Sequence, residues 1–561
     1  MVTPLPALPR FVLPRLASLV QGGAALLWLP QAALLAWTIS GMTAGASWRA
    51  AVPPAAGIVL LGLLRAAGEA WGARTLYAAA RTHLSTLRAQ VALALAQRSP
   101  LDRQRAQSGQ AASVIAEQAE AIVPYLVRYQ SARWKVLLVP LVILAVIFPL
   151  SWIAALVLLV AAPLIPVFMA LVGMGAQAAS RAQMVEMGGM NAFLLDRLRG
   201  LATLRALDAV EATADRLDAS AQSLRRRTMA VLRIAFLSSA VLELFSALGV
   251  AMVAAYIGFS LLGTFNFGSW GSKLSLNEGL FILLLAPAFF EPLRELAAVW
   301  HDKAAGQAGL AALADLADGG VAMPGSGATT AVVPDIVHAA PPALRLQGLG
   351  FAHAGEAPLF DGFDLQVRPG EQVALLGASG AGKSTLLSLI AGLLPATSGT
   401  IQIGGVALDD ATVGGLRQRM GWMGQRPHVF AASVSRNISL GREDADPGAV
   451  ANVAAALRLA ELATVSQAQP GVMLGDGAQG LSGGEAVRLA LARVALHPHA
   501  DLLLVDEPTA HLDSETAARV TDALLLLARG KTLIVATHDP VLAARLSRRV
   551  LLGAQTQELQ A

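Results

Sequence analysis

"GASGAGKS", residues 377–384, decides the fold of the C-terminal half of the chain. It fits the pattern G-x-x-x-x-G-K-[ST], in which glycines let successive backbone N–H groups curl around phosphate. The apolar run QVALL precedes it and STLLSLIAGLL follows it, which predicts a strand leading into the loop and a helix leaving it. This context separates a phosphate-binding loop from a chance glycine-rich turn. The sequence therefore predicts a nucleotide-binding P-loop.

Two side chains of this loop are predicted to contact the nucleotide or its metal ion. Lys383 is predicted to reach the β- and γ-phosphates of ATP, and Ser384 to bind Mg²⁺. The following helix adds the N–H groups of its first turn, which favour an anion. We expect nine consecutive residues to contact ATP, namely Gly377, Ala378, Ser379, Gly380, Ala381, Gly382, Lys383, Ser384 and Thr385.

A second candidate element is LLLVDE, residues 502–507, an apolar run that ends in two carboxylates. It is typical of a buried strand about 120 residues after the P-loop. Asp506 is suited to hold Mg²⁺ through water, and Glu507 to orient or deprotonate the attacking water. Together with the P-loop, the acidic pair predicts ATP hydrolysis.

Composition places the first part of the chain in a membrane. Of 561 residues, 55% are hydrophobic and 14% charged, and the mean hydropathy is +0.57. A bilayer takes about 20 apolar residues per helix, and the first 300 residues contain runs of that length. The first run precedes Ala44-Gly45-Ala46, which resembles a signal cleavage site, but it is longer than a signal h-region, so we interpret it as a retained span. Six spans are predicted, at about 17–42, 50–72, 125–149, 152–175, 232–262 and 279–303.

The distribution of basic residues predicts the orientation of these spans. Arginines are concentrated in the two long segments after spans two and four, whereas the short loops on the other side carry little beyond Arg49 and Lys273. This asymmetry predicts that both long loops, both termini and the ATPase domain are cytoplasmic. It also argues against nucleic acid as a partner, despite a pI near 9.7. The absence of cysteine excludes disulfides, thiolate metal sites and cysteine nucleophiles.

Three parts are therefore predicted along the chain. Residues 1–318 form a transmembrane domain of six helices with cytoplasmic extensions, and residues 319–343 form a linker rich in Gly, Pro, Ala and Thr. Residues 344–561 alternate short β-like runs with helical stretches, which predicts an α/β nucleotide-binding domain with a largely parallel sheet. Residues 191–207 have apolar residues at helical spacing. This spacing predicts either a helix that docks onto another domain or a solvated helical hairpin.

LSGGE, residues 481–485, resembles the signature motif of ABC transporter ATPases. Gln425 matches the Q-loop of that family, the run 510–513 its D-loop, and His538 its switch histidine. Six predicted spans ahead of such an ATPase resemble an ABC exporter half-transporter. The resemblance implies an α-helical six-span membrane domain followed by an α/β P-loop ABC ATPase, which uses ATP and Mg²⁺ to drive transport.

The resemblance also implies the roles of particular residues. Glu507, His538 and Gln425 would be catalytic, with Mg²⁺ held by Ser384, Gln425 and Asp506. Two ATPase domains would stack head to tail, so that Ser482, Gly483 and Gly484 close in trans over ATP bound by a partner half-transporter. A heterodimer and a homodimer both remain open.

Three features of the sequence depart from the family pattern. Glu485 ends the signature motif where glutamine is usual, and Ala510-His511 replaces the usual Ser-Ala of the D-loop. The aromatic residue expected to stack on adenine is His353, with Phe351 as the alternative. These departures leave open whether both composite ATP sites hydrolyse ATP.

The last two predicted spans carry a finer resemblance. Residues 281–304, FILLLAPAFFEPLRELAAVWHDKA, and 241–263, VLELFSALGVAMVAAYIGFSLLG, look like the sixth and fifth spans of the CydD-type subunit of CydDC exporters. The resemblance implies a heterodimer with a CydC-like chain, export of cysteine or glutathione, and support of cytochrome bd assembly. Haem has also been proposed as the cargo of that family, so haem stays open as a ligand or cargo.

A polar stripe in the sixth span predicts a substrate path. On one continuous helix, Glu291, Arg294, Glu295 and His301 fall within about a 120° arc, and Glu243 of span five lies at a similar depth. Charge at that depth usually faces a bundle interior or a water-filled cavity. The mixed stripe suits a zwitterion such as cysteine or glutathione, whereas Arg294 with His301 equally suits haem. Alternatively, the glutamates are struts, paired with Arg294, Arg65 or the partner chain.

The sequence thus predicts an ATP-driven exporter subunit in the bacterial cytoplasmic membrane, with the lipid bilayer, a small-molecule cargo and a second half-transporter as partners. Haem transport, a lipid or drug flippase, and a regulatory ABC ATPase without transport are the alternatives.

Overall fold

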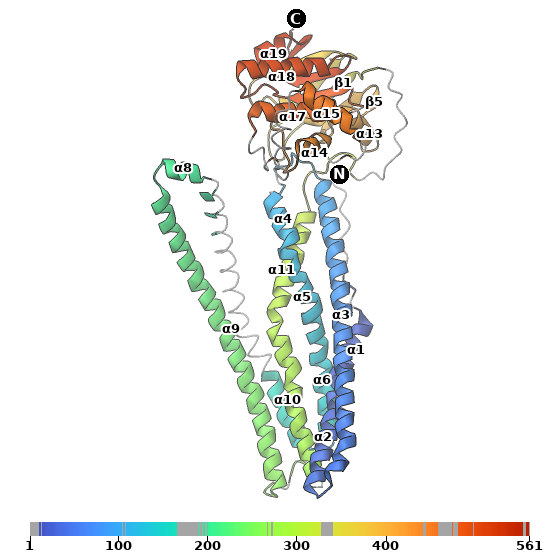
Figure 1. Ribbon diagram of the computed structural model, residues 1–561, viewed down its shortest axis with the longest axis vertical. Helices are drawn as coiled ribbons and strands as arrows, with labels where there is room; N and C mark the ends of the chain where they lie inside the picture. Colours follow the sequence, from blue (N-terminus) through green and yellow to red (C-terminus); the bar gives the residue numbers. More distant parts are fainter. Residues whose placement is uncertain are drawn as a thin grey trace. The chain divides into compact units, whose positions relative to one another are not determined.

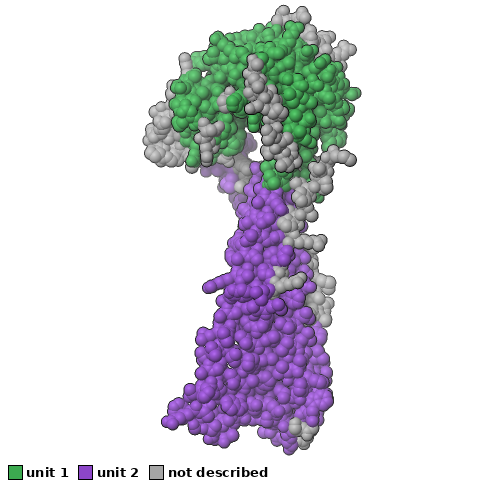
Figure 2. All heavy atoms as spheres, turned by 90° about the vertical axis from the view of Figure 1, so that its right-hand side faces the viewer, with its two compact units in different colours: residues 1–5, 93–106, 318–561 green, residues 6–92, 107–317 purple. Residues whose placement is uncertain are grey.

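The computed structural model contains two compact units, coloured separately in Figure 2. One comprises the described parts of Leu93–Ala106 and Asp318–Ala561, and the other those of Pro6–Ala92 and Gln107–Ala317. We call them the ATPase unit and the membrane unit. The structure describes residues 11–164, 190–326, 340–457, 474 and 481–559, with gaps at 13, 104, 107, 191–192, 195–196, 199, 266, 271–272, 441, 443–444, 498 and 554–556.

Long helices build the membrane unit (Figure 1). Four helical segments of the described chain are long and apolar enough to cross a membrane, namely Leu16–Thr43, Trp48–Ala96, Ser108–Ile147 and Ala240–Leu261. The shorter apolar helix Trp152–Leu164 covers the start of the fourth predicted span, and the rest of that span lies outside the described residues. The helices are α1 Arg15–Leu26, α2 Trp28–Thr43, η1 Trp48–Ala51, α3 Val52–Ala96, α4 Ser108–Ala116, η2 Gln118–Ala121, α5 Ile122–Pro124, η3 Tyr125–Tyr129, α6 Gln130–Ile147, α8 Leu201–Ala206, α9 Val210–Leu261, α10 Leu276–Ala298 and α11 Trp300–Ala317.

The third and sixth predicted spans differ from single α-helices. The third begins with the π-helical turn η3 before α6 starts at Gln130. In the sixth, α10 continues through Pro287 and Pro292, and the helical path is interrupted at Val299, whose φ of −103° and ψ of 9° leave the helical region. His301 therefore lies on α11 and not on α10. The prediction that His301 continues the face of Glu291 assumed one uninterrupted helix, and that assumption is wrong.

Packing of α9 against α10 depends on a small residue in the membrane unit's core. Phe289 and Phe290 of α10 are fully buried. A Cβ added at Gly249 of α9 would lie only 2.5 Å from Cζ of Phe290. The absence of a side chain at this position therefore lets the two helices approach, as small residues do between membrane helices.

In the described part of the ATPase unit, the strands form two sheets. A six-stranded sheet has the order β10-β9-β3-β8-β7-β6, in which every neighbouring pair is parallel except β10 with β9. This confirms the predicted α/β fold with a largely parallel sheet. A four-stranded antiparallel sheet, β2-β1-β4-β5, was not predicted. The strands are β1 Leu344–Phe351, β2 Phe360–Val367, β3 Gln372–Leu376, β4 Ser398–Ile403, β5 Val406–Ala407, β6 Met420–Met423, β7 Leu502–Asp506, β8 Thr532–Ala536, β9 Arg548–Leu551 and β10 Gln557–Leu559.

Sheet order brings distant parts of the sequence to one edge. Strands β3, β8 and β7 are parallel neighbours, so their carboxyl ends lie together, where ligands bind in open α/β sheets. The P-loop follows β3, Asp506 ends β7 with Glu507 directly after it, and His538 follows β8. The helices of this unit are α12 Lys383–Ile390, α13 Val413–Gln418, α14 Val434–Ser439, α15 Pro447–Ala456, α17 Gly483–Ala495, α18 Ser514–Leu527 and α19 Pro540–Ala544.

Two predictions fall partly outside the described part of the chain. Residues 327–339 of the predicted linker are not described. Only parts of the predicted docking segment 191–207 are described, among them α8.

Candidate functional site

The P-loop has the backbone geometry that its glycines predict. Gly380 and Gly382 have φ of 85° and 92°, in the left-handed region that favours glycine. A Cβ at Gly382 would lie 2.8 Å from Cζ of Phe360, and one at Gly377 would lie 2.8 Å from the carbonyl oxygen of Leu552. A side chain at either position would therefore clash with the wall of the loop.

Lys383 lies inside this loop, at the N-terminus of α12. Its Nζ donates hydrogen bonds to the carbonyl oxygens of Gly377 at 2.8 Å and Ala378 at 3.2 Å. The same Nζ lies 4.0 Å from Oε1 of Glu507, and both side chains are buried. The ammonium thus connects the loop to the acidic end of β7.

Glu507 is held in a defined position next to His538. Its backbone N–H donates to the carbonyl of Ala536 at 2.8 Å, and its φ of 47° is unusual for a residue with a side chain. Nδ1 of His538 donates to Oε2 of Glu507 at 2.7 Å. Strained backbone of this kind persists where surrounding contacts fix it, often at functional sites. The structure thus brings these two predicted catalytic residues together.

Asp506 fits the role of a Mg²⁺ site. Its side chain is buried, and Oδ1 has no hydrogen-bond partner among the described residues. Burial raises the pKa of the Asp506 carboxyl, and a hydrogen bond with the Ser384 hydroxyl partly offsets this. A buried carboxylate oxygen beside a hydroxyl forms the oxygen donor set that Mg²⁺ prefers. Gln425, the third predicted ligand, lies just beyond β6 on an exposed turn.

The signature segment caps helix α17. Ser482 is the N-cap residue, and it forms a capping box with Glu485. Gly484 is buried against α18, since a Cβ there would lie 2.4 Å from Cγ2 of Thr516, whereas Ser482 and Gly483 are exposed. The exposed N-terminus of α17 is thus available to a partner domain.

The two other departures from the family pattern, at His353 and in the D-loop, each have a defined local geometry. His353 follows β1 and is half-buried, with its ring edge-on to Phe351 at 4.9 Å between centroids. Phe351 itself is only 7% exposed, so of the two rings His353 is the more available for stacking on adenine. His511 adopts a φ of 62°, and Asp513 caps α18 through the backbone N–H of Thr516.

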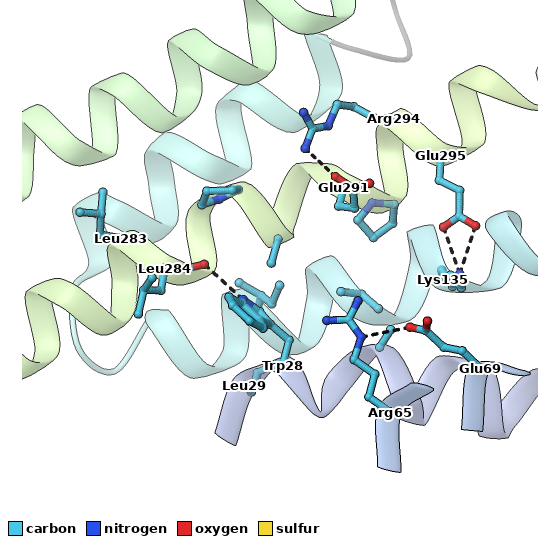
Figure 3. A pocket seen from close by; sticks show the side chains of 16 residues that line it. Trp28, Leu29, Arg65, Glu69, Lys135, Leu283, Leu284, Glu291, Arg294 and Glu295 are labelled. Atoms are coloured by element: carbon cyan, nitrogen blue, oxygen red, sulfur yellow. Dashed lines mark hydrogen bonds and ion pairs between the residues drawn. The ribbon is translucent and has the colours of Figure 1, made fainter. Parts of the chain in front are cut away.

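The membrane unit contains a cavity of about 390 Å³ beside α10 (Figure 3). Much of its wall is apolar, including Trp28, whose indole N–H donates to the carbonyl of Leu284 at 3.3 Å. The volume falls within the range of about 300–1,000 Å³ that is usual for small-molecule sites. Three cationic and three acidic side chains also line it, namely Arg65, Lys135, Arg294, Glu69, Glu291 and Glu295.

The charges around this cavity form ion pairs, drawn as dashed lines in Figure 3. Nη2 of Arg294 lies 2.5 Å from Oε2 of Glu291, and Nζ of Lys135 lies 3.1 Å from both carboxylate oxygens of Glu295. Arg65 pairs with Glu69 along α3, at 3.0 Å.

The predicted stripe is thus partly assembled at this cavity. Glu291, Arg294 and Glu295 line it, and Glu243 of α9 is connected to it through Nη1 of Arg294 at 3.5 Å. His301 lies elsewhere on α11, with its Nε2 3.2 Å from Asp302.

Lys135 and Glu69 were missed as cavity residues. A signal was present, because Lys135 is a charge within a predicted span, and such residues usually face a bundle interior.

Comparison with known proteins agrees with the fold. Residues 360–510 match the ABC transporter family, and residues 16–284 match the ABC transporter transmembrane region. The chain therefore belongs to the ABC transporters, as an exporter that joins a membrane domain to an ATPase which hydrolyses ATP to drive transport. The predicted fold class is confirmed.

Similar individual proteins point in the same direction. The chain is 39% identical over 433 residues to the transport ATP-binding protein AarD of Providencia stuartii, covering 77% of this chain and 72% of that one. It is 36% identical over 453 residues to the glutathione/L-cysteine transport system ATP-binding/permease protein CydD of Escherichia coli K12, covering 81% and 76%. A bacterial Atm1-family ABC exporter with ATP bound has the same fold, with a TM-score of 0.71, 21% identity and 95% and 94% coverage.

Proposed function

We propose that this subunit exports a small thiol, cysteine or glutathione, from the cytoplasm across the bacterial inner membrane, and so supports cytochrome bd assembly. A CydC-like half-transporter completes the complex, and both termini face the cytoplasm. The similarity to CydD of Escherichia coli, whose name specifies glutathione and L-cysteine, supports this assignment.

The observation that carries the proposal is the balanced charge of the membrane cavity. Cysteine and glutathione present both carboxylate and ammonium groups, so they need cations and anions within one site. The cavity lining has three of each, on a wall that is otherwise mostly apolar. A ligand carboxylate can replace Glu291 or Glu295 as the partner of Arg294 or Lys135, because these pairs are not fully buried. A lipid flippase is expected to have a larger and more apolar cavity.

ATP hydrolysis would proceed at the carboxyl end of the parallel sheet. The P-loop and Lys383 hold the phosphates, and Glu507, oriented by His538, positions the water that attacks the γ-phosphate. Mg²⁺, held by Ser384, Asp506 and Gln425, would neutralise charge on the phosphates. His353 would stack on the adenine ring.

Closure of the site requires a second ATPase domain. Ser482, Gly483 and Gly484 would close over ATP on the partner's P-loop, and the partner's signature segment over ATP on this chain. Closure would turn the membrane cavity outward, and hydrolysis would reset it.

Transport into inside-out vesicles tests this proposal. Vesicles carrying this chain, with and without a CydC-like partner, are given ATP and labelled glutathione or cysteine, with Glu507→Gln as the control. Uptake that needs both chains and is lost in the variant supports thiol export. Robust ATPase activity without thiol uptake would contradict it and favour haem, and after haem a lipid, as cargo.

A further inference from the structure

The signature segment carries a negative charge where the related motif has a neutral amide. Both the backbone N–H and the hydroxyl of Ser482 donate to Oε2 of Glu485, at 2.7 and 2.8 Å. The backbone N–H of Glu485 donates back to Oγ of Ser482 at 3.4 Å. The Ser482 hydroxyl, which would reach for phosphate in the closed complex, is therefore engaged by a carboxylate of its own chain.

A carboxylate at this position acts differently from a glutamine. Glutamine can complete the same capping box, but as a neutral acceptor. A hydrogen bond to a carboxylate is charge-assisted and roughly twice as strong, so it competes better for the hydroxyl. The carboxylate also neutralises part of the partial positive charge at the N-terminus of α17. That positive charge otherwise favours binding of an anion.

We propose that Glu485 weakens the hold of this signature segment on the γ-phosphate of ATP bound by the partner ATPase domain. The inference rests on the proposed pairing of two ATPase domains. Glu485 acts through Ser482 and is a positioning residue. The composite site that contains this segment needs more ATP to close than a site with glutamine at the same position. The two sites of a heterodimer become unequal when the partner's segment has glutamine there.

The membrane unit contains a matched control for this change. Ser275 and Glu278 form the same capping box at the start of α10. The Ser275 N–H and hydroxyl both donate to Oε2 of Glu278 at 2.8 Å, and Glu278 N–H donates back at 3.3 Å. Glu278→Gln therefore makes the same chemical change to the same cap, away from any nucleotide site.

ATP hydrolysis by the full-length pair, measured against ATP concentration at saturating Mg²⁺, tests the inference. Glu485→Gln should lower the KM for ATP about tenfold, as expected when a charge-assisted contact stops competing for the hydroxyl. The effect should shrink in 1 M salt, where the Debye length falls to about 3 Å. Glu485→Ala, which removes the cap, should lower thermal stability and also lower the KM, whereas Glu278→Gln should leave the KM unchanged.

Two results overturn the inference. If the KM is unchanged in Glu485→Gln while the wild-type pair shows partner-dependent hydrolysis, Glu485 is a helix cap and nothing more. If the wild-type pair shows no partner-dependent hydrolysis, the proposed pairing fails and this inference fails with it.

Discussion

Nδ1 of His538 lies 2.7 Å from Oε2 of Glu507, so the residues that follow two neighbouring parallel strands form one hydrogen-bonded unit. Glu507 is only 8% exposed, whereas the side chain of His538 is 69% exposed. A buried carboxylate thus receives a donor from a side chain that solvent, nucleotide or a partner domain can reach. The proposed catalytic glutamate is thereby coupled to the surface of the ATPase unit.

This coupling predicts a non-additive pair of variants. Glu507→Gln should reduce ATP hydrolysis about 100-fold or more, the usual contribution of a positioned base, while ATP binding persists. His538→Ala should give a smaller loss, and adding it to Glu507→Gln should lower the rate little further, since residues that act as a unit are not additive. Rates and ATP affinities of the two single variants and the double variant test this. Fully additive losses would contradict the unit.

Asp506→Asn should raise the Mg²⁺ concentration for half-maximal ATPase activity about tenfold or more, because a charged oxygen ligand becomes a neutral amide. Asp522→Asn is the matched control, since Asp522 pairs with Arg545 on the exposed face of α18. A Mg²⁺ titration at fixed ATP concentration distinguishes the two variants. An unchanged Mg²⁺ requirement in Asp506→Asn would remove Asp506 from the metal site.

Gly249→Ala should lower the free energy of unfolding of the membrane unit by about 1–3 kcal/mol, as overpacking of a tight core usually does. The added Cβ would meet the fully buried Phe290 ring. Gly258→Ala on the same helix is the control, because no described atom lies within 4 Å of its added Cβ. Thermal unfolding in detergent should show a lower midpoint only for the first variant, and equal midpoints would refute the close approach.

Lys135→Gln should raise the thiol concentration needed for half-maximal transport about tenfold, if Lys135 exchanges Glu295 for a ligand carboxylate. Arg294→Gln should act in the same direction. Arg519→Gln, which breaks an exposed ion pair with Glu515 on α18, is the control. Transport measured against thiol concentration tests this, and a loss of maximal rate at constant half-saturation would argue that the pairs are struts.

Local sequence patterns predicted much of the fold around the candidate ATP site. The run QVALL, the glycines after it and the acidic end of LLLVD each determine a short element, and parallel strand order then brings their ends together. The antiparallel sheet of β1, β2, β4 and β5 was missed. The alternation of apolar and polar residues in these segments does not show which strand pairs with which, or in what register.

The membrane cavity was harder to predict for a similar reason. Helix periodicity shows which residues share a face, but Lys135 and Glu295 are 160 positions apart, and their pairing depends on how α6 packs against α10. His301 shows the other limit. Its predicted place on the face of Glu291 assumed one helix, and the interruption at Val299 places it on α11.

We propose that hydrolysis at Glu507 moves a small thiol through the membrane unit. The most direct measurement follows ATP hydrolysis and glutathione or cysteine uptake together, in proteoliposomes that contain this chain and a CydC-like partner with the ATPase domains outside. We predict that thiol stimulates hydrolysis and accumulates inside, and that both signals vanish in Glu507→Gln. Vigorous hydrolysis that is indifferent to thiol, with no accumulation, would contradict thiol export by this chain.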